Sequence, residues 1–81
     1  MAIRTERWFN VRLGDRPSHG GRRLVELSFE AAGVAFAEHW APHPDAGGEV
    51  AVIVRDEDTG VERCFRIELA TGEAEPCERE A

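Results

Sequence analysis

The chain has 81 residues and a formal net charge of −6, which suits one small domain and leaves little room for an enclosed substrate pocket. Every basic residue is arginine: residues 1–40 carry six arginines against five acids, and residues 41–81 carry four against eleven. Binding to nucleic-acid phosphates needs a basic surface, so this balance argues against direct nucleic-acid binding. One basic cluster surrounds a glycine-rich loop, and we interpret it as solvated because no helix begins directly after the loop; it comprises Arg12, Arg16, Arg22 and Arg23.

The chain has no apolar run long enough to span a membrane, and its first residues do not form a signal peptide. We therefore expect a cytoplasmic protein without a membrane partner. In a reducing cytoplasm the two cysteines, Cys64 and Cys77, are expected to be thiols.

The first half of the chain predicts a hairpin followed by a helix. Residues Trp8 to Leu13 alternate between apolar and polar side chains with the period of a half-buried strand, and Leu24 to Leu27 predicts a second strand that pairs back on it. Ser28 is expected to cap a helix from Phe29 to Trp40. Gly33, inside that helix, predicts a close approach of the helix to the sheet.

The apolar stripe of this helix is expected to contain Phe29, Ala32, Phe36 and Trp40, with Ala35 beside it.

The second half predicts two long strands and a short one. Glu49 to Arg55 and Val61 to Leu69 form a hairpin, joined by an acidic turn, Asp56 to Gly60, that we expect to be solvated, with Gly60 at positive φ. Glu75 to Cys77 predicts a short edge strand, which Pro76 weakens.

These elements predict an α+β fold, a two-layer sandwich in which one helix packs on an antiparallel sheet in the order β-β-α-β-β(-β). The simplest packing is an antiparallel meander that wraps one face of the helix. We expect a single domain over residues 1–81, with the last few residues frayed.

A metal site built on His39, His43, Cys64 and Cys77 is one alternative. The histidines are four apart, but Pro42 lies between them, and the cysteines are thirteen apart, whereas zinc knuckles place theirs two to four apart. The favoured interpretation is no metal and no cofactor.

Cys64 could also act as a nucleophile beside Arg66, or pair with Cys77 as a cross-strand disulfide. No nucleophile elbow or oxyanion hole accompanies Cys64, so we expect no enzyme activity.

The sequence best fits a non-enzymatic interaction or regulatory module that binds a protein partner, or itself, through the exposed face or an edge of the sheet. The candidate contacts are Trp8, which is expected to face outward on the first strand, Ile53 and Arg66. Two alternatives stay open: an acidic phage-type inhibitor that mimics nucleic acid, and a small metal or thiol protein.

From Ser28 onward the sequence resembles a family of small uncharacterised proteins of alphaproteobacteria. The resemblance lies in SFEAA at residues 28–32, FAE and Trp40 in the helix, DTG at 58–60, CFRIEL at 64–69 and GEAEPC at 72–77. It covers about two-thirds of the chain and omits the first hairpin. It implies a bacterial cytoplasmic protein, a domain of unknown function.

Overall fold

The computed structural model describes residues 5–14, 21–40 and 48–77. Arg16, His43 and the acidic end of the chain, for which we predicted fraying, lie outside these ranges. The described elements are β1 (Arg7–Leu13), β2 (Arg22–Glu26), α1 (Phe29–Trp40), β3 (Glu49–Asp56), β4 (Glu62–Glu68) and β5 (Ala74–Pro76).

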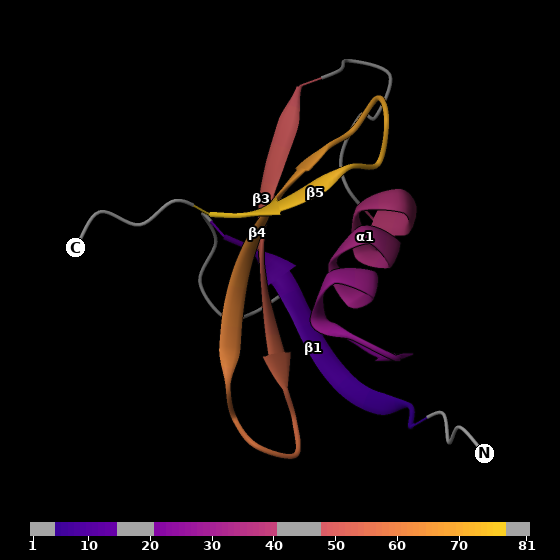
Figure 1. Ribbon diagram of the computed structural model, residues 1–81, viewed down its shortest axis with the longest axis vertical. Helices are drawn as coiled ribbons and strands as arrows, with labels where there is room; N and C mark the ends of the chain where they lie inside the picture. Colours follow the sequence, from indigo (N-terminus) through magenta and orange to yellow (C-terminus); the bar gives the residue numbers. More distant parts are fainter. Residues whose placement is uncertain (1–4, 15–20, 41–47, 78–81) are drawn as a thin grey trace.

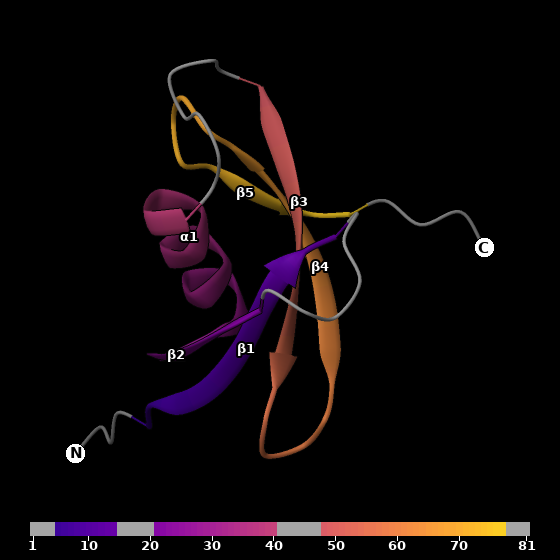
Figure 2. The same cartoon turned by 180° about the vertical axis from the view of Figure 1, so that it is seen from behind.

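The strands form one antiparallel sheet in the spatial order β2-β1-β3-β4-β5, with α1 against one of its faces (Figure 1). The predicted α+β fold class is confirmed. The predicted meander is wrong at one connection: β1 lies between β2 and β3 (Figure 2), so the chain crosses over through α1. Because β2 and β3 are both antiparallel to β1, they run parallel to each other, and such strands need a long crossover instead of a tight turn.

The core lies between α1 and the inner face of the sheet. Strand alternation sends every second side chain of β1, β3 and β4 toward the helix. The buried apolar residues are Phe9, Val11, Ala32, Phe36, Ala37, Val52, Val54, Phe65 and Ile67.

The predicted helix stripe is correct at Ala32 and Phe36 but wrong at its last residue. Trp40 is 40% exposed, and Ala37 is buried in place of the predicted Ala35. Trp40 lies on the last turn, stacked against Phe36 with 5.8 Å between ring centroids. It therefore borders the core instead of filling it.

Two local features of α1 confirm their predictions. The backbone N–H of Ala31 donates to the Ser28 hydroxyl at 3.1 Å, which caps the helix. Gly33 is buried, and a Cβ at this position would lie 3.3 Å from Cγ2 of Val52 and 3.4 Å from Cδ1 of Ile67. The absent side chain allows the helix to sit close to the sheet.

The turn from β3 to β4 differs from its prediction. Gly60 has a φ of 80°, as expected, but Asp56 is 1% exposed and not solvated. Its carboxylate lies 2.9 Å from Nη1 of Arg7 and accepts hydrogen bonds from the backbone N–H groups of Asp58 and Thr59. Asp56 therefore orders the turn and ties it to the start of β1.

Cys64 on β4 and Cys77 directly after β5 are joined by a disulfide, with their Cα atoms 5.3 Å apart. The backbone N–H of Cys77 also donates to the carbonyl of Cys64 at 3.0 Å. The cross-strand pairing that the sequence left open is therefore present, and the expectation of two free thiols is wrong for this structure. The disulfide fastens the shortest strand to its neighbour.

Candidate interaction surface on the outer face of the sheet

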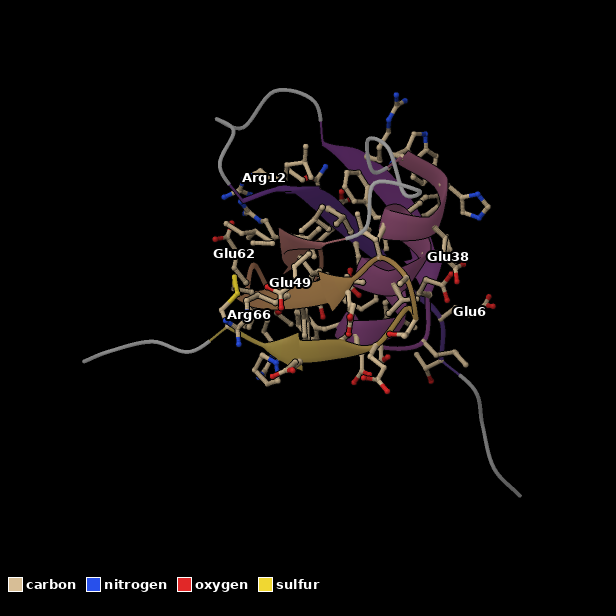
Figure 3. All side chains as sticks on the ribbon, turned by 90° about the horizontal axis from the view of Figure 1, so that it is seen from above. Glu6, Arg12, Glu38, Glu49, Glu62 and Arg66 are labelled. Atoms are coloured by element: carbon tan, nitrogen blue, oxygen red, sulfur yellow. A yellow bond between two sulfur atoms is a disulfide. The ribbon has the colours of Figure 1, made fainter. Side chains whose placement is uncertain are left out.

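The outer face of the sheet points away from α1, and no described element packs over it. Figure 3 looks along the sheet and shows Arg12, Glu62 and Arg66 on the side opposite the helix. Side chains from all five strands reach this face, since the register brings their outward positions together.

Trp8 lies on this outer face, as predicted, and is 47% exposed. The Arg23 guanidinium stacks over its indole ring, 4.3 Å from the ring centroid. Arg23 is itself held by Glu57, with Nε–Oε1 and Nη2–Oε1 distances of 3.0 Å. One side of the ring is therefore covered by Arg23 while about half of its surface stays in solvent.

Sequence reasoning missed two apolar residues beside Trp8. Val25 is the direct cross-strand partner of Trp8 and is 38% exposed. Leu27, just past the end of β2, is 45% exposed, and the alternation of β2 continued by one step assigns it to the same side as Val25. We call Trp8, Val25 and Leu27 the Trp8 patch. The sequence marked both residues as apolar, but the register that places Val25 opposite Trp8 comes from the structure.

Ile53 and Arg66 also belong to the outer face but lie apart from the Trp8 patch. Ile53 pairs with Arg12, four residues along β1 from Trp8, which is a distance of about 13 Å at the usual rise of a strand. Arg66 pairs with Ala51, diagonal to Ile53. The three predicted contact residues therefore share one face but form two separate regions.

The charges of the outer face alternate in sign. Arg12 pairs with Glu62 at 3.5 Å, and Arg66 pairs with Glu75 at 3.7 Å. The Nε atom of Arg66 is buried and has no hydrogen-bond partner among the described residues. A nucleic-acid mimic needs a continuous acidic surface, and this interleaving of arginine and glutamate does not provide one on the outer face.

The residues of the proposed metal site are not assembled in the described part of the chain. His39 lies on the last turn of α1, with its ring 5.6 Å from that of Trp40. Both cysteine sulfurs are committed to the disulfide on the outer side of the sheet, and His43 lies outside the described residues. Within the described ranges no group of three or more His, Cys, Asp or Glu residues could hold a metal ion.

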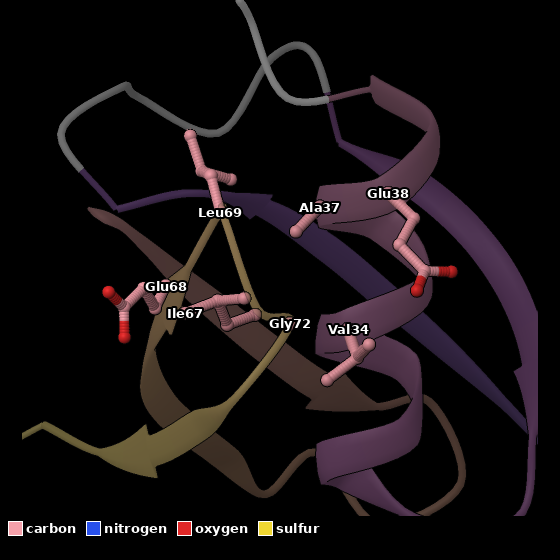
Figure 4. Close-up of a pocket in the computed structure, with 7 residues that line it drawn as sticks. All are labelled: Val34, Ala37, Glu38, Ile67, Glu68, Leu69 and Gly72. Atoms are coloured by element: carbon pink, nitrogen blue, oxygen red, sulfur yellow. The ribbon is translucent and has the colours of Figure 1, made fainter. Parts of the chain in front are cut away.

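A shallow groove of about 160 Å³ opens on the helix side of the sheet. Its walls are Val34 and Ala37 of α1 and Leu69 just beyond β4, and Figure 4 shows Glu38 and Glu68 pointing to opposite sides. Pockets for drug-sized ligands usually exceed about 300 Å³. The described lining of the groove contains two carboxylates, of Glu38 and Glu68, and no Ser, Cys, His or Lys side chain.

A second hollow, of about 240 Å³, lies beside the disulfide and is lined by Arg63, Phe65 and Pro76 together with the two cysteines. It is open to solvent along the β4–β5 edge. Its sulfur atoms are bonded to each other, so neither is available as a thiolate.

The fold is a small α+β sandwich in which α1 covers one face of the sheet and no described element covers the other. A model of the family of unknown function DUF5961 matches residues 7–78, and the chain belongs to that family. The match includes the first hairpin, which the resemblance noted from the sequence had omitted. No curated protein and no solved structure matches the chain. In the described ranges no helix is both long and apolar enough to cross a membrane.

Proposed function

We propose that this chain is a non-enzymatic interaction module that binds a protein partner through the outer face of its sheet, with the Trp8 patch as the anchor. The observation that carries the proposal is the half-exposed Trp8, which lies beside exposed Val25 and Leu27 on a face that no described element covers. Tryptophan is enriched among the residues that dominate binding energy at protein interfaces.

The surroundings of Trp8 favour binding because they hold its ring in one position. Arg23 stacks on the indole and is bonded to Glu57, so little side-chain freedom remains to be lost when a partner covers the ring. The same two charged residues form a polar border on one side of the apolar patch. An apolar centre with a polar rim is the usual composition of a specific interface.

Ile53 and Arg66 supply a second region about 13 Å along the same face. A partner of ordinary size would contact both regions. The partly exposed side chain of Arg66 would offer its charge to an acidic group of the partner.

The test is capture of partners from the native host by the tagged chain, comparing wild type with Trp8→Ala. Trp40→Ala is the matched control, because Trp40 has a similar exposed fraction (40% against 47%) but lies at the end of α1. Val25→Ser repeats the comparison at a position of the patch that is not tryptophan. Its control is Val61→Ser, because Val61 is also exposed but lies in the β3–β4 turn. Thermal unfolding of each variant establishes that it is folded.

We expect one partner to bind wild type and both control variants and to be lost from Trp8→Ala and Val25→Ser. Truncating a central aromatic residue of an interface usually weakens binding by about 2 kcal/mol or more, or about 30-fold. A partner that binds Trp8→Ala as tightly as wild type would refute the proposal.

A further inference from the structure

The two edges of the sheet are built differently. β5 has three residues, contains Pro76 and is fastened by the disulfide, which are features that block pairing with another chain. β2 has five residues and no proline, and no other described strand pairs with its outer side. β2 is therefore the edge at which this sheet can be extended.

The hydrogen bonds of β1 show which backbone groups of β2 are free. The N–H of Glu57 donates to the carbonyl of Trp8 at 3.0 Å, so the backbone of Trp8 faces β3. Trp8 and Val25 are therefore a non-hydrogen-bonded pair in the antiparallel ladder between β1 and β2. The N–H and C=O groups of Val25, and of Arg23 two residues before it, consequently point outward from the edge.

We propose that two copies of this chain pair through their β2 strands, antiparallel and centred on Leu24, to form a symmetric dimer. This inference goes beyond the proposed function, because the dimer uses the β2 edge of the sheet and does not depend on the Trp8 patch. In this register Arg23 of one copy lies opposite Val25 of the other, and these residues carry the outward-facing backbone groups. Each such pair exchanges two hydrogen bonds, and the two Leu24 side chains meet at the close, non-hydrogen-bonded position between them.

Charge complementarity selects this register. It places Arg22 of each copy opposite Glu26 of the other, in two symmetric pairs on the helix side of the sheet. Neither residue has an ion-pair partner among the described residues, since the four ion pairs found there use other side chains. The Arg22 guanidinium lies over the Trp40 ring, with its carbon 5.4 Å from the ring centroid, but no ion pair neutralises its charge or that of Glu26, and both charges are available to the seam.

Other registers are less favourable. If the register is shifted by two residues in one direction, Arg23 of one copy lies opposite Arg23 of the other. A shift by two residues in the other direction removes both Arg22–Glu26 pairs. Parallel pairing in register puts like charges opposite each other at Arg22, Arg23 and Glu26, which is destabilising. Shifts by one residue would place core-facing side chains opposite solvent-facing ones.

The dimer would join the two sheets into one and keep both helices on the same side, because the two-fold axis is perpendicular to the sheet. The Trp8 patches of the two copies would then flank the seam on the outer face, since Val25 neighbours Trp8 in each copy. The outer surface would present two equivalent anchors to further partners.

Sedimentation velocity of the purified chain over a concentration series tests the inference. Wild type should show a monomer–dimer equilibrium that weakens as salt is raised. Arg22→Glu and Glu26→Arg should each weaken it by about tenfold or more, because each change converts two opposite-charge pairs into two like-charge pairs. An equimolar mixture of the two variants should form a heterodimer, since their seams are complementary in charge. Val25→Pro removes an edge N–H that the monomer does not use and should also abolish the dimer.

A wild type that stays monomeric at every concentration would overturn the dimer, as would an undiminished dimer in Val25→Pro or a mixture that fails to associate. Thermal unfolding of each variant separates loss of association from loss of the fold. The two proposals fail separately. A monomeric wild type that still captures a partner through Trp8 overturns only the dimer, and an intact dimer whose partner ignores Trp8 overturns only the role of the Trp8 patch.

Discussion

Breaking the bond between Cys64 and Cys77 should destabilise the domain by about 3 kcal/mol at 25 °C. The two residues are separated by 13 positions, and the loss of loop entropy in the unfolded chain for a loop of that size gives this value. A domain of this length has a total stability of about 4–12 kcal/mol. The disulfide therefore accounts for a substantial part of it.

The assay is thermal and urea unfolding of wild type, with and without reductant, beside Cys64→Ala/Cys77→Ala. Because 1 kcal/mol shifts the midpoint of a small domain by about 4–8 °C, we expect a lowering of about 12–24 °C. Reduced wild type should match the double variant, and reductant should not change the double variant. Before reduction, thiol titration should find no reactive cysteine.

The loss of stability on reduction should first appear at β5. The N–H of Cys77, which donates to the carbonyl of Cys64, should exchange faster with solvent than the amides of β1 and β3 once the bond is reduced. A midpoint that moves by less than about 3 °C would refute the reasoning, because the disulfide would then not constrain the unfolded chain as calculated.

Three further substitutions test the core and the turns by urea unfolding. Asp56→Ala should cost about 3 kcal/mol, since it leaves two turn N–H groups and Arg7 without their partner. Arg7→Ala should cost less, because the Arg7 side chain is 36% exposed. A larger loss of stability for Arg7→Ala than for Asp56→Ala would contradict the buried role of Asp56. Gly33→Val should cost about 2 kcal/mol through overlap with the side chain of Val52, and a neutral result would mean that helix and sheet are not in close contact. Ser28→Ala should cost about 1 kcal/mol with unchanged folded-state helicity, whereas Ser28→Asp should be close to neutral because aspartate also caps helices.

Local chemistry made much of this fold predictable from sequence. The helix was predicted with its observed bounds, because Ser28 caps its start and prolines follow its end. The strands of the second hairpin were predicted within one residue at each end, since Val50, Val52 and Val54 recur at every second position in a run rich in β-branched residues. The Trp8 side chain was correctly expected on the outer face for the same reason.

The sequence by itself therefore determined the type of each element, the periodicity of its apolar residues and the face of each strand that packs on the core. These features depend on neighbours a few residues apart. Only the tertiary structure decided which strands pair. It placed β1 between β2 and β3, buried Asp56 against Arg7, and brought Val25 beside Trp8. These contacts join residues far apart in the chain, and their free energy depends on packing in three dimensions, which periodicity along the sequence does not contain.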